Sequence, residues 1–201
     1  MKIAVFLGAL DGNKEVYKIK AQELGKWIAL SGNTLVYGAS KKGTMGVIAD
    51  AVLENGGKVI GVCVKYRMLN DSKHDNLTEC IETETLTERR LKIIDIADAY
   101  IALPGGPGTL DEITEIVSLA RLSENDKPCY LYDLDGFYQP LKDMFDMMLK
   151  TGFAIPEFFK NVVISDDFAI PYTRSSSIKA IVISTSSLAP LIVERCILSS
   201  L

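Results

Sequence analysis

A glycine-rich segment with the sequence LPGGPGTLDE, at residues 103–112, lies between two stretches of different periodicity. The apolar run before it, 99–103, has the length and composition of a buried strand. After it, apolar residues recur at helical spacing, at Leu110, Ile113, Ile116, Val117 and Ala120. The segment is therefore expected to carry the chain from a strand into a helix, the repeating step of α/β proteins.

The same succession of strand, turn and helix occurs along most of the chain. Strands are predicted at residues 2–8, 34–37, 58–64, 99–103, 128–132 and 161–164. Helices are predicted at residues 14–31, from 46 through 52 to 56, and at 86–97, 109–123 and 137–151. This alternation favours a single doubly wound, Rossmann-like α/β domain at residues 1–167, with a mostly parallel sheet and helices on both faces.

Two segments do not follow this alternation. Residues 65–85 are polar and irregular, and are expected to form a mobile loop near the site. Residues 168–201 form an atypical C-terminal tail that is apolar and rich in serine. A packing helix or strand is favoured there over a second site, and the tail is given no role.

The composition is that of an ordinary globular domain. With 201 residues, 48% of them hydrophobic, the chain can build one full core. Its net charge of −4 argues against a broad nucleic-acid surface, although a local basic pocket is compatible with it. No apolar stretch approaches the roughly 18 residues of a membrane span. The sequence enters a strand pattern directly after Met1, so no secretory signal and a cytoplasmic location are expected.

Neither a metal nor an organic cofactor is expected. The single histidine, His74, lacks the partners for a metal site. The cysteines lie far apart in the sequence, without a CxxC pair, at Cys63, Cys80, Cys129 and Cys196. Buried free thiols in a reducing compartment are the expected state of these residues.

Three glycines follow predicted strands and are expected to share one edge of the sheet: Gly8, Gly38 and Gly105. In doubly wound sheets ligands bind beyond the carboxyl ends of the strands. The backbone N–H groups of Gly105, Gly106 and Gly108 can approach a ligand without interference from a Cβ atom, and the helix dipole there favours an anion, most often a phosphate. Thr109 is expected to cap the helix and to offer a hydroxyl. A tight turn without a ligand is the alternative interpretation.

Charged residues near two predicted helix starts are candidates for chemistry. Glu112 and Glu115 are three apart, roughly on one helix face. Arg89 and Arg90 stand near the start of the helix at 86–97, where cations are mildly unfavourable. Either one arginine faces the site and binds a phosphate or ribose, or both lie on a solvated helix edge.

The segment PGGPGTLDE, at residues 104–112, matches the PGGxGTxxE signature of the LOG family. These proteins are cytokinin riboside 5'-monophosphate phosphoribohydrolases, often mislabelled as lysine decarboxylases. The sequence LTERR, at residues 86–90, is similar to the family motif MxxRK, with leucine for methionine and Arg90 for lysine. The resemblance extends from about Lys2 to about Asp167.

The resemblance implies hydrolysis of the N-glycosidic bond of a nucleoside 5'-monophosphate, AMP-like or a cytokinin riboside monophosphate, to free base and ribose 5-phosphate. Arg89 and Glu112 are the catalytic pair that it implies. It also implies a homodimer, to which apolar helix faces such as 113–119 would contribute. The residues expected to bind phosphate or substrate are Gly105, Gly106, Gly108, Thr109, Arg90, Gly8, Gly43, Met45, Gly46 and Glu115. The segment DLDGFY, at 133–138, is also similar to the family, although a turn and a helix with Phe137 in the core would explain it.

Other parts of the sequence depart from the family pattern. The segment at 37–46, YGASKKGTMG, stands where the family has YGGGSxGLMG, and Gly8-Ala9-Leu10 replaces Gly-Ser-Ser. Cys63-Val64 replaces Ile-Pro. Lys41 and Lys42 are candidates for extra phosphate contacts or for solvated loop charges.

Two other functions are alternatives to hydrolysis. The altered loops leave room for a carrier that binds a nucleotide or the molybdenum cofactor without turnover. A pyridoxal-phosphate-dependent decarboxylase is rejected, because no lysine of this sequence lies in a recognisable aldimine context.

Overall fold

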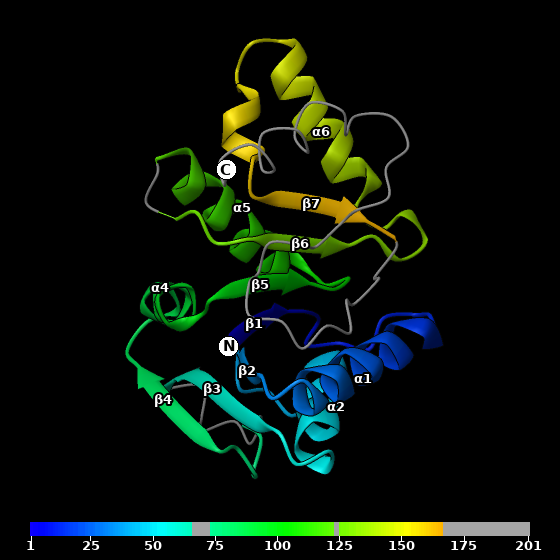
Figure 1. Cartoon of the computed structure of the whole chain (residues 1–201), viewed down its shortest axis with the longest axis vertical. Coiled ribbons are helices and arrows are strands. Elements are labelled where there is room, and N and C mark those ends of the chain that lie inside the picture. Colours follow the sequence, from blue (N-terminus) through cyan, green and yellow to red (C-terminus); the bar gives the residue numbers. More distant parts are fainter. Residues whose placement is uncertain (66–72, 123–124, 167–201) are drawn as a thin grey trace, which may run out of the picture.

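A sheet of seven strands forms the centre of the computed structural model, which describes residues 1–65, 73–122 and 125–166 (Figure 1). In chain order the strands are β1 (Lys2–Phe6), β2 (Thr34–Tyr37), β3 (Lys58–Val64), β4 (Glu79–Thr83), β5 (Ala99–Ala102), β6 (Cys129–Tyr132) and β7 (Val162–Ser165). Their spatial order is β4-β3-β2-β1-β5-β6-β7, and every neighbouring pair is parallel. The order reverses between β1 and β5, the place where doubly wound sheets bind ligands.

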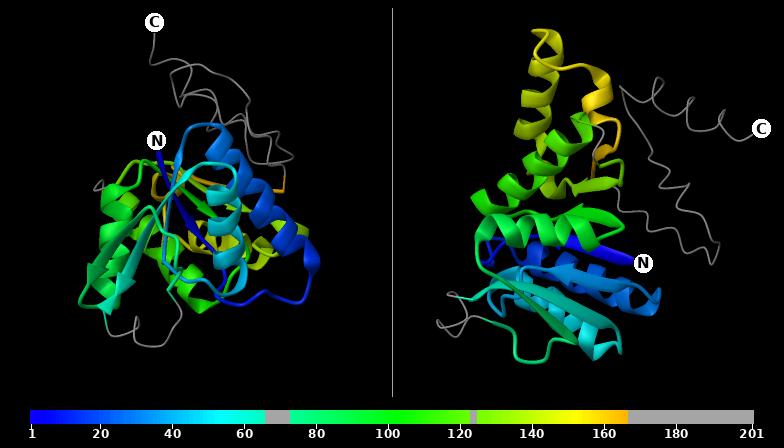
Figure 2. Two further views of the ribbon diagram at one scale, coloured as in Figure 1. Left: turned by 90° about the horizontal axis from the view of Figure 1, so that it is seen from below. Right: turned by 90° about the vertical axis from the view of Figure 1, so that its left-hand side faces the viewer.

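Helices cover both faces of the sheet (Figure 2). One face carries α1 (Glu15–Leu30) and α2 (Gly43–Glu54), which contact each other, and the other carries α4 (Leu86–Ile96) and α5 (Pro107–Arg121). The short helices η1 (Leu134–Gly136) and η2 (Pro156–Phe159) flank α6 (Gln139–Lys150), which lies at the β7 end. The doubly wound α/β fold expected from the sequence is confirmed. None of the described helices is long and apolar enough to cross a bilayer.

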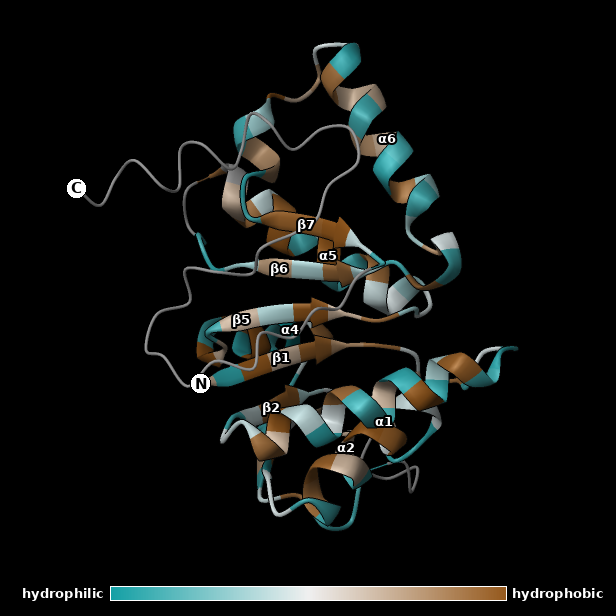
Figure 3. Ribbon diagram, turned by 45° about the vertical axis from the view of Figure 1, so that its right-hand side comes forward, coloured by the Kyte–Doolittle hydropathy of each residue, from teal (hydrophilic) through white to brown (hydrophobic). Residues whose placement is uncertain are grey.

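The core has two layers because alternate strand residues face opposite sides of the sheet. On β1, Ile3 and Val5 pack in the layer under α1 and α2, whereas Ala4 and Phe6 pack in the layer under α4 and α5. Strands that are buried on both sides need continuous apolar runs, and Figure 3 shows such hydrophobic strands. These runs are the reason why most of the strands can be predicted from the sequence.

β4 has no counterpart among the strands expected from the sequence. It lies inside residues 65–85, which were expected to be an irregular loop, yet it pairs with β3 from Ile60↔Glu79 to Val64↔Thr83. β4 is an edge strand, so exposed charges at Glu79 and Glu82 are tolerated and its sequence, ECIET, lacks a long apolar run. Residues 66–72 of that segment lie outside the described residues, as does the tail at 168–201.

α5 begins earlier than expected. Its N-cap is Gly106 and its first residue is Pro107, a residue well suited to this position because it lacks an N–H group. Thr109 therefore lies within the first turn of the helix and is 4% exposed. The expectation that Thr109 caps the helix was wrong.

Candidate active site

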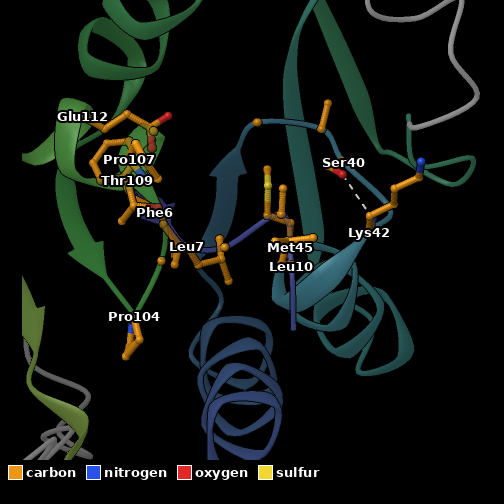
Figure 4. A pocket seen from close by; sticks show the side chains of 18 of the residues that line it. Phe6, Leu7, Leu10, Ser40, Lys42, Met45, Pro104, Pro107, Thr109 and Glu112 are labelled. Carbon is orange, nitrogen blue, oxygen red and sulfur yellow. Dashed lines mark hydrogen bonds between the residues drawn. The ribbon is translucent and has the colours of Figure 1, made fainter. Parts of the chain in front are cut away.

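A cavity of about 660 Å³ opens beyond the carboxyl ends of β1, β2, β3 and β5 (Figure 4). Gly8, Gly38 and Gly105, expected to share one edge of the sheet, all line it. In Figure 4, Glu112 and Thr109 lie on one wall, and Met45 and Leu10 lie on the opposite wall. The cavity therefore occupies the point where the strand order reverses.

The N-terminus of α5 forms part of the cavity wall. A Cβ atom added at Gly106 or Gly108 would meet no atom within 4 Å, so the backbone at both positions borders open space. A Cβ atom at Gly105 would instead overlap the Thr109 side chain, so glycine is needed there for packing. The first N–H groups of a helix have no partner within it, and together with the helix dipole they can hold an anionic group.

Arg89 and Glu112 meet in this cavity. Arg89 Nη1 of α4 lies 3.7 Å from Glu112 Oε1 of α5, and both residues line the cavity. Arg89 Nε donates a hydrogen bond to the Val62 carbonyl oxygen at 3.0 Å. The convergence of the two side chains expected from the motifs is therefore present, and β3 fixes the orientation of the guanidinium group.

Glu112 is nearly buried, with 9% of its surface exposed. Burial raises the pKa of its carboxyl group from 4.5 to about 7, with a smaller contribution from Asp111 and Glu115, whereas Arg89 and Arg90 act in the opposite direction. At neutral pH this carboxyl group can therefore both accept and release a proton, as general acid–base chemistry requires.

Arg90 and Glu115 lie elsewhere than expected. Arg90 Nε is 2.7 Å from Glu115 Oε2, and Arg90 Nη1 is 2.9 Å from Asp111 Oδ2. These three residues line a second, smaller hollow, together with Thr114 and Ser118, and are not part of the described lining of the main cavity. Consecutive side chains on a helix diverge by about 100°, so Arg89 and Arg90 cannot face the same space.

Comparisons with known proteins identify the family of this chain. The family described as "Possible lysine decarboxylase" matches residues 45–170. Cytokinin riboside 5'-monophosphate phosphoribohydrolase LOG of Oryza sativa subsp. japonica is 38% identical over 164 residues, which cover 82% of this chain and 67% of the rice protein. The cytokinin riboside 5'-monophosphate phosphoribohydrolase of Rhodococcoides fascians is 34% identical over 176 residues, 86% of this chain and 89% of that protein. The chain belongs to the LOG family.

Two solved structures similar to this LOG-family chain are named for the molybdenum cofactor. The Moco carrier protein from Chlamydomonas reinhardtii is 26% identical, with a TM-score of 0.60 over 83% of this chain and 89% of that one. The molybdenum cofactor binding protein from Rippkaea orientalis is 23% identical, also with a TM-score of 0.60, over 82% and 88% of the two chains. The second likeness shows a common fold.

The second glycine loop of this LOG-family chain lines the cavity with some residues and packs against neighbouring backbone with others. Met45 lines the cavity, and its N–H group donates to the Gly8 carbonyl oxygen at 3.2 Å. Gly43 has a φ of +61° and lies against the backbone of Ala9, where a Cβ atom would overlap. Gly46 lies against the backbone of Lys41 in the same way. The sequence predicts that both glycines bind substrate, whereas in the structure both pack against neighbouring backbone.

Several residues of the cavity wall were not foreseen. Phe137, expected in the core, is 41% exposed and lines the cavity, with its ring 6.4 Å from that of Tyr17. Tyr138 is the buried neighbour instead. Leu10 is 82% exposed at the rim. These residues lie in or beside turns, where the periodicity of the sequence does not indicate which way a side chain points.

The two lysines of the second loop differ in position. Lys42 lines the cavity, although its side chain points away from Glu112 in Figure 4. Lys41 Nζ is 3.4 Å from the exposed Asp75 carboxylate, which fits the solvated loop charge considered for it. Lys73, which was not singled out, lines the cavity beside them and pairs with Ser40 in a β-bridge.

Proposed function

We propose that this chain hydrolyses the N-glycosidic bond of a nucleoside 5'-monophosphate, AMP-like or a cytokinin riboside monophosphate, to free base and ribose 5-phosphate. The observation that carries the proposal is the meeting of Arg89 and Glu112 beside the α5 N-terminus in one cavity. Membership of the LOG family supports it, as do relatives named cytokinin riboside 5'-monophosphate phosphoribohydrolase.

The 5'-phosphate binds at the start of α5 in this proposal. Gly106 and Gly108 border open space, so a phosphate oxygen can reach their backbone N–H groups, and Thr109 lies in the same turn. Gly105 keeps the loop close to Thr109. The phosphate then fixes the ribose next to Glu112, one helical turn further along α5.

Glu112 acts on the sugar. Cleavage of the N-glycosidic bond builds positive charge on the ribose, as in an oxocarbenium ion, and a carboxylate beside the ring stabilises that charge. The same carboxylate can take a proton from the attacking water, because its pKa lies near the working pH. Arg89 orients the substrate and assists the departing base electrostatically, and it opposes the rise in the pKa of Glu112.

Arg90 holds the two catalytic helices together in this proposal. It is the residue after Arg89 on α4, and it binds the residues on either side of Glu112 along α5, namely Asp111 and Glu115. A guanidinium group that bridges two carboxylates restricts both helices. The separation of Arg89 and Glu112 then depends on Arg90 without any contact between Arg90 and substrate.

A chromatographic screen for free base, released from a panel of nucleoside monophosphates, tests the proposal. Base release is expected from the wild type and its loss from Glu112→Gln and from Arg89→Ala. Glu54→Gln, at the exposed end of α2, is the matched control and should keep full activity. Equal inertness of the wild type and both variants across the panel would refute the enzyme proposal.

A carrier that binds its ligand without turnover is the second candidate. It is favoured by the likeness to Moco carrier protein and by the altered loops at Ala9 and Ala39. It predicts thermal stabilisation by a nucleotide or pterin ligand with no product formed. Steady base release would exclude it.

We also propose a homodimer that uses the side of the sheet covered by α4 and α5. Ile113 and Ile116, which the sequence analysis offered for the interface, are buried in this chain's own core. The exposed leucines of this side are Leu91 on α4 and Leu110 and Leu122 at either end of α5. Light scattering should give twice the chain mass for the wild type and a shift towards monomer for Leu91→Glu with Leu110→Glu.

A further inference from the structure

Two thiols lie in contact beside the cavity, and one of them, Cys63, lines it. Cys63 Sγ on β3 and Cys80 Sγ on β4 are 3.1 Å apart. Cys63 is opposite Glu82 in the register, two residues from Cys80, so both side chains point to the same face of the sheet. Cys63 is 6% exposed and lines the cavity, and Cys80 is partly exposed. The sequence predicts thiols at both positions, and the structure adds that the two are in contact.

We propose that Cys63 and Cys80 form a redox modification site, in which a low-molecular-weight disulfide converts the two thiols into a disulfide bond between β3 and β4. The third described cysteine, Cys129, is buried on β6. Strands β2, β1 and β5 separate β6 from β3, so Cys129 does not share this contact. Among the described cysteines, only Cys63 and Cys80 therefore form the site.

The order of the chemical steps follows from exposure and acidity. Burial, together with the hydrogen bond between Cys63 and Cys80, raises the pKa of the Cys63 thiol to about 12, so Cys63 reacts poorly with an external oxidant. Cys80 is the accessible partner. Its thiolate attacks one sulfur of the external disulfide, which forms a mixed disulfide on Cys80 and releases one thiolate that takes a proton.

The second step closes the bond within the protein. Cys63 loses its proton and attacks the Cys80 sulfur, which expels the second small thiolate, and that thiolate takes the proton. In sum, two protein thiols lose two electrons and two protons, and one external disulfide is reduced to two thiols. The contact at 3.1 Å places the Cys63 sulfur next to the Cys80 sulfur that it attacks.

The bond would act on the candidate active site through Arg89. The two sulfur atoms must approach from 3.1 Å to about 2.0 Å, so β3 and β4 shift towards each other. Val62, the residue before Cys63, accepts the Arg89 hydrogen bond, and β4 leads through Thr85 into the helix that carries Arg89. Displacement of a catalytic group by about 1 Å can lower a rate about 100-fold. Oxidation is therefore expected to lower base release, a readout that rests on the proposed function.

Mapping of the disulfide tests the site without any activity measurement. Cys196 lies outside the described residues, so all proteins carry Cys196→Ser. The reduced protein is treated with glutathione disulfide, digested and analysed by mass spectrometry. A Cys63–Cys80 bridge is expected, with glutathione trapped on Cys80 in the Cys63→Ser variant and no modification of Cys63 in the Cys80→Ser variant. A bridge to Cys129, or glutathione that remains on Cys80 when Cys63 is present, overturns the proposal.

Base release before and after oxidation tests the link to Arg89. The oxidised protein should lose activity several-fold and regain it with dithiothreitol, whereas the Cys80→Ser variant should not respond. A mapped bridge with unchanged base release overturns the coupling to Arg89. If the reduced protein releases no base from any nucleotide, the proposed hydrolase function fails, while the mapping still decides the modification site.

Discussion

The guanidinium group of Arg89 lies where a side chain on Gly38 would be. A Cβ atom built at Gly38 overlaps the terminal nitrogen of Arg89 and would also come within 2.8 Å of Met45 Cε. The glycine that follows β2 therefore leaves the space for a side chain of α4, some fifty residues later in the chain. This relationship assigns Gly38 a role in holding Arg89 next to Glu112.

The substitution Gly38→Ala should separate Arg89 from Glu112. We expect kcat/KM for base release to fall about 10- to 100-fold, because the methyl group pushes the guanidinium out of place. The double variant Gly38→Ala with Arg89→Ala should be no worse than Arg89→Ala alone, since both changes act through one side chain. Additive losses in this double-mutant cycle would show that Gly38 acts elsewhere.

Alanine at Gly106 or Gly108 should impair phosphate binding without harm to the fold. Both positions border open space, so a methyl group there fills the cavity instead of overlapping protein. Gly108→Ala should even raise stability by up to about 1 kcal/mol, because alanine favours the helix. Gly105→Ala is the contrasting variant and should destabilise the protein through its overlap with Thr109. Calorimetry with ribose 5-phosphate and thermal unfolding measure both effects, and unchanged affinity in Gly106→Ala would contradict the assignment.

Base release should depend on the protonation of Glu112. Its pKa is raised to about 7, and the proposed role requires the carboxylate. We therefore expect kcat/KM to be constant above about pH 8 and to fall tenfold per pH unit below pH 7. A profile that instead falls on the alkaline side of pH 7 would make Glu112 a general acid.

Glu112 should also cost stability at high pH. Its pKa is raised in the folded protein, so the folded state holds the proton more tightly than the unfolded chain does. Stability from this group is therefore complete below about pH 4.5 and is lost as the pH rises through about 7. Glu112→Gln should be more stable than the wild type by up to about 3 kcal/mol above pH 8, with no advantage near pH 4.5. Urea unfolding at several pH values tests this, and a gain independent of pH would point to another cause.

Much of the fold was readable because the strands are apolar on both faces. Six strands and five helices were located within a few residues, and the rim of Gly8, Gly38 and Gly105 followed from topology alone. β4 was missed because one side of an edge strand is open and its charged residues hide the strand pattern. Local sequence does not reveal which strands lie at an edge.

The site was only partly readable for a different reason. Arg89 and Glu112 were paired through the family motifs, and their helices do bring them together. Arg90 and Glu115 were assigned to substrate, whereas the directions of their side chains lead to each other outside the cavity. Those directions depend on how α4 and α5 pack, and periodicity within one helix does not contain that information.

The two catalytic candidates differ in how firmly the sheet supports them. Arg89 follows β4, the outermost strand, whereas Glu112 follows β5, which has neighbours on both sides. Edge strands of a sheet unfold locally at a lower free-energy cost than its central strands. Local unfolding of β4 would therefore displace Arg89 from the cavity and abolish catalysis. The N-terminus of α5, with its N–H groups, and the Glu112 carboxylate would stay in place.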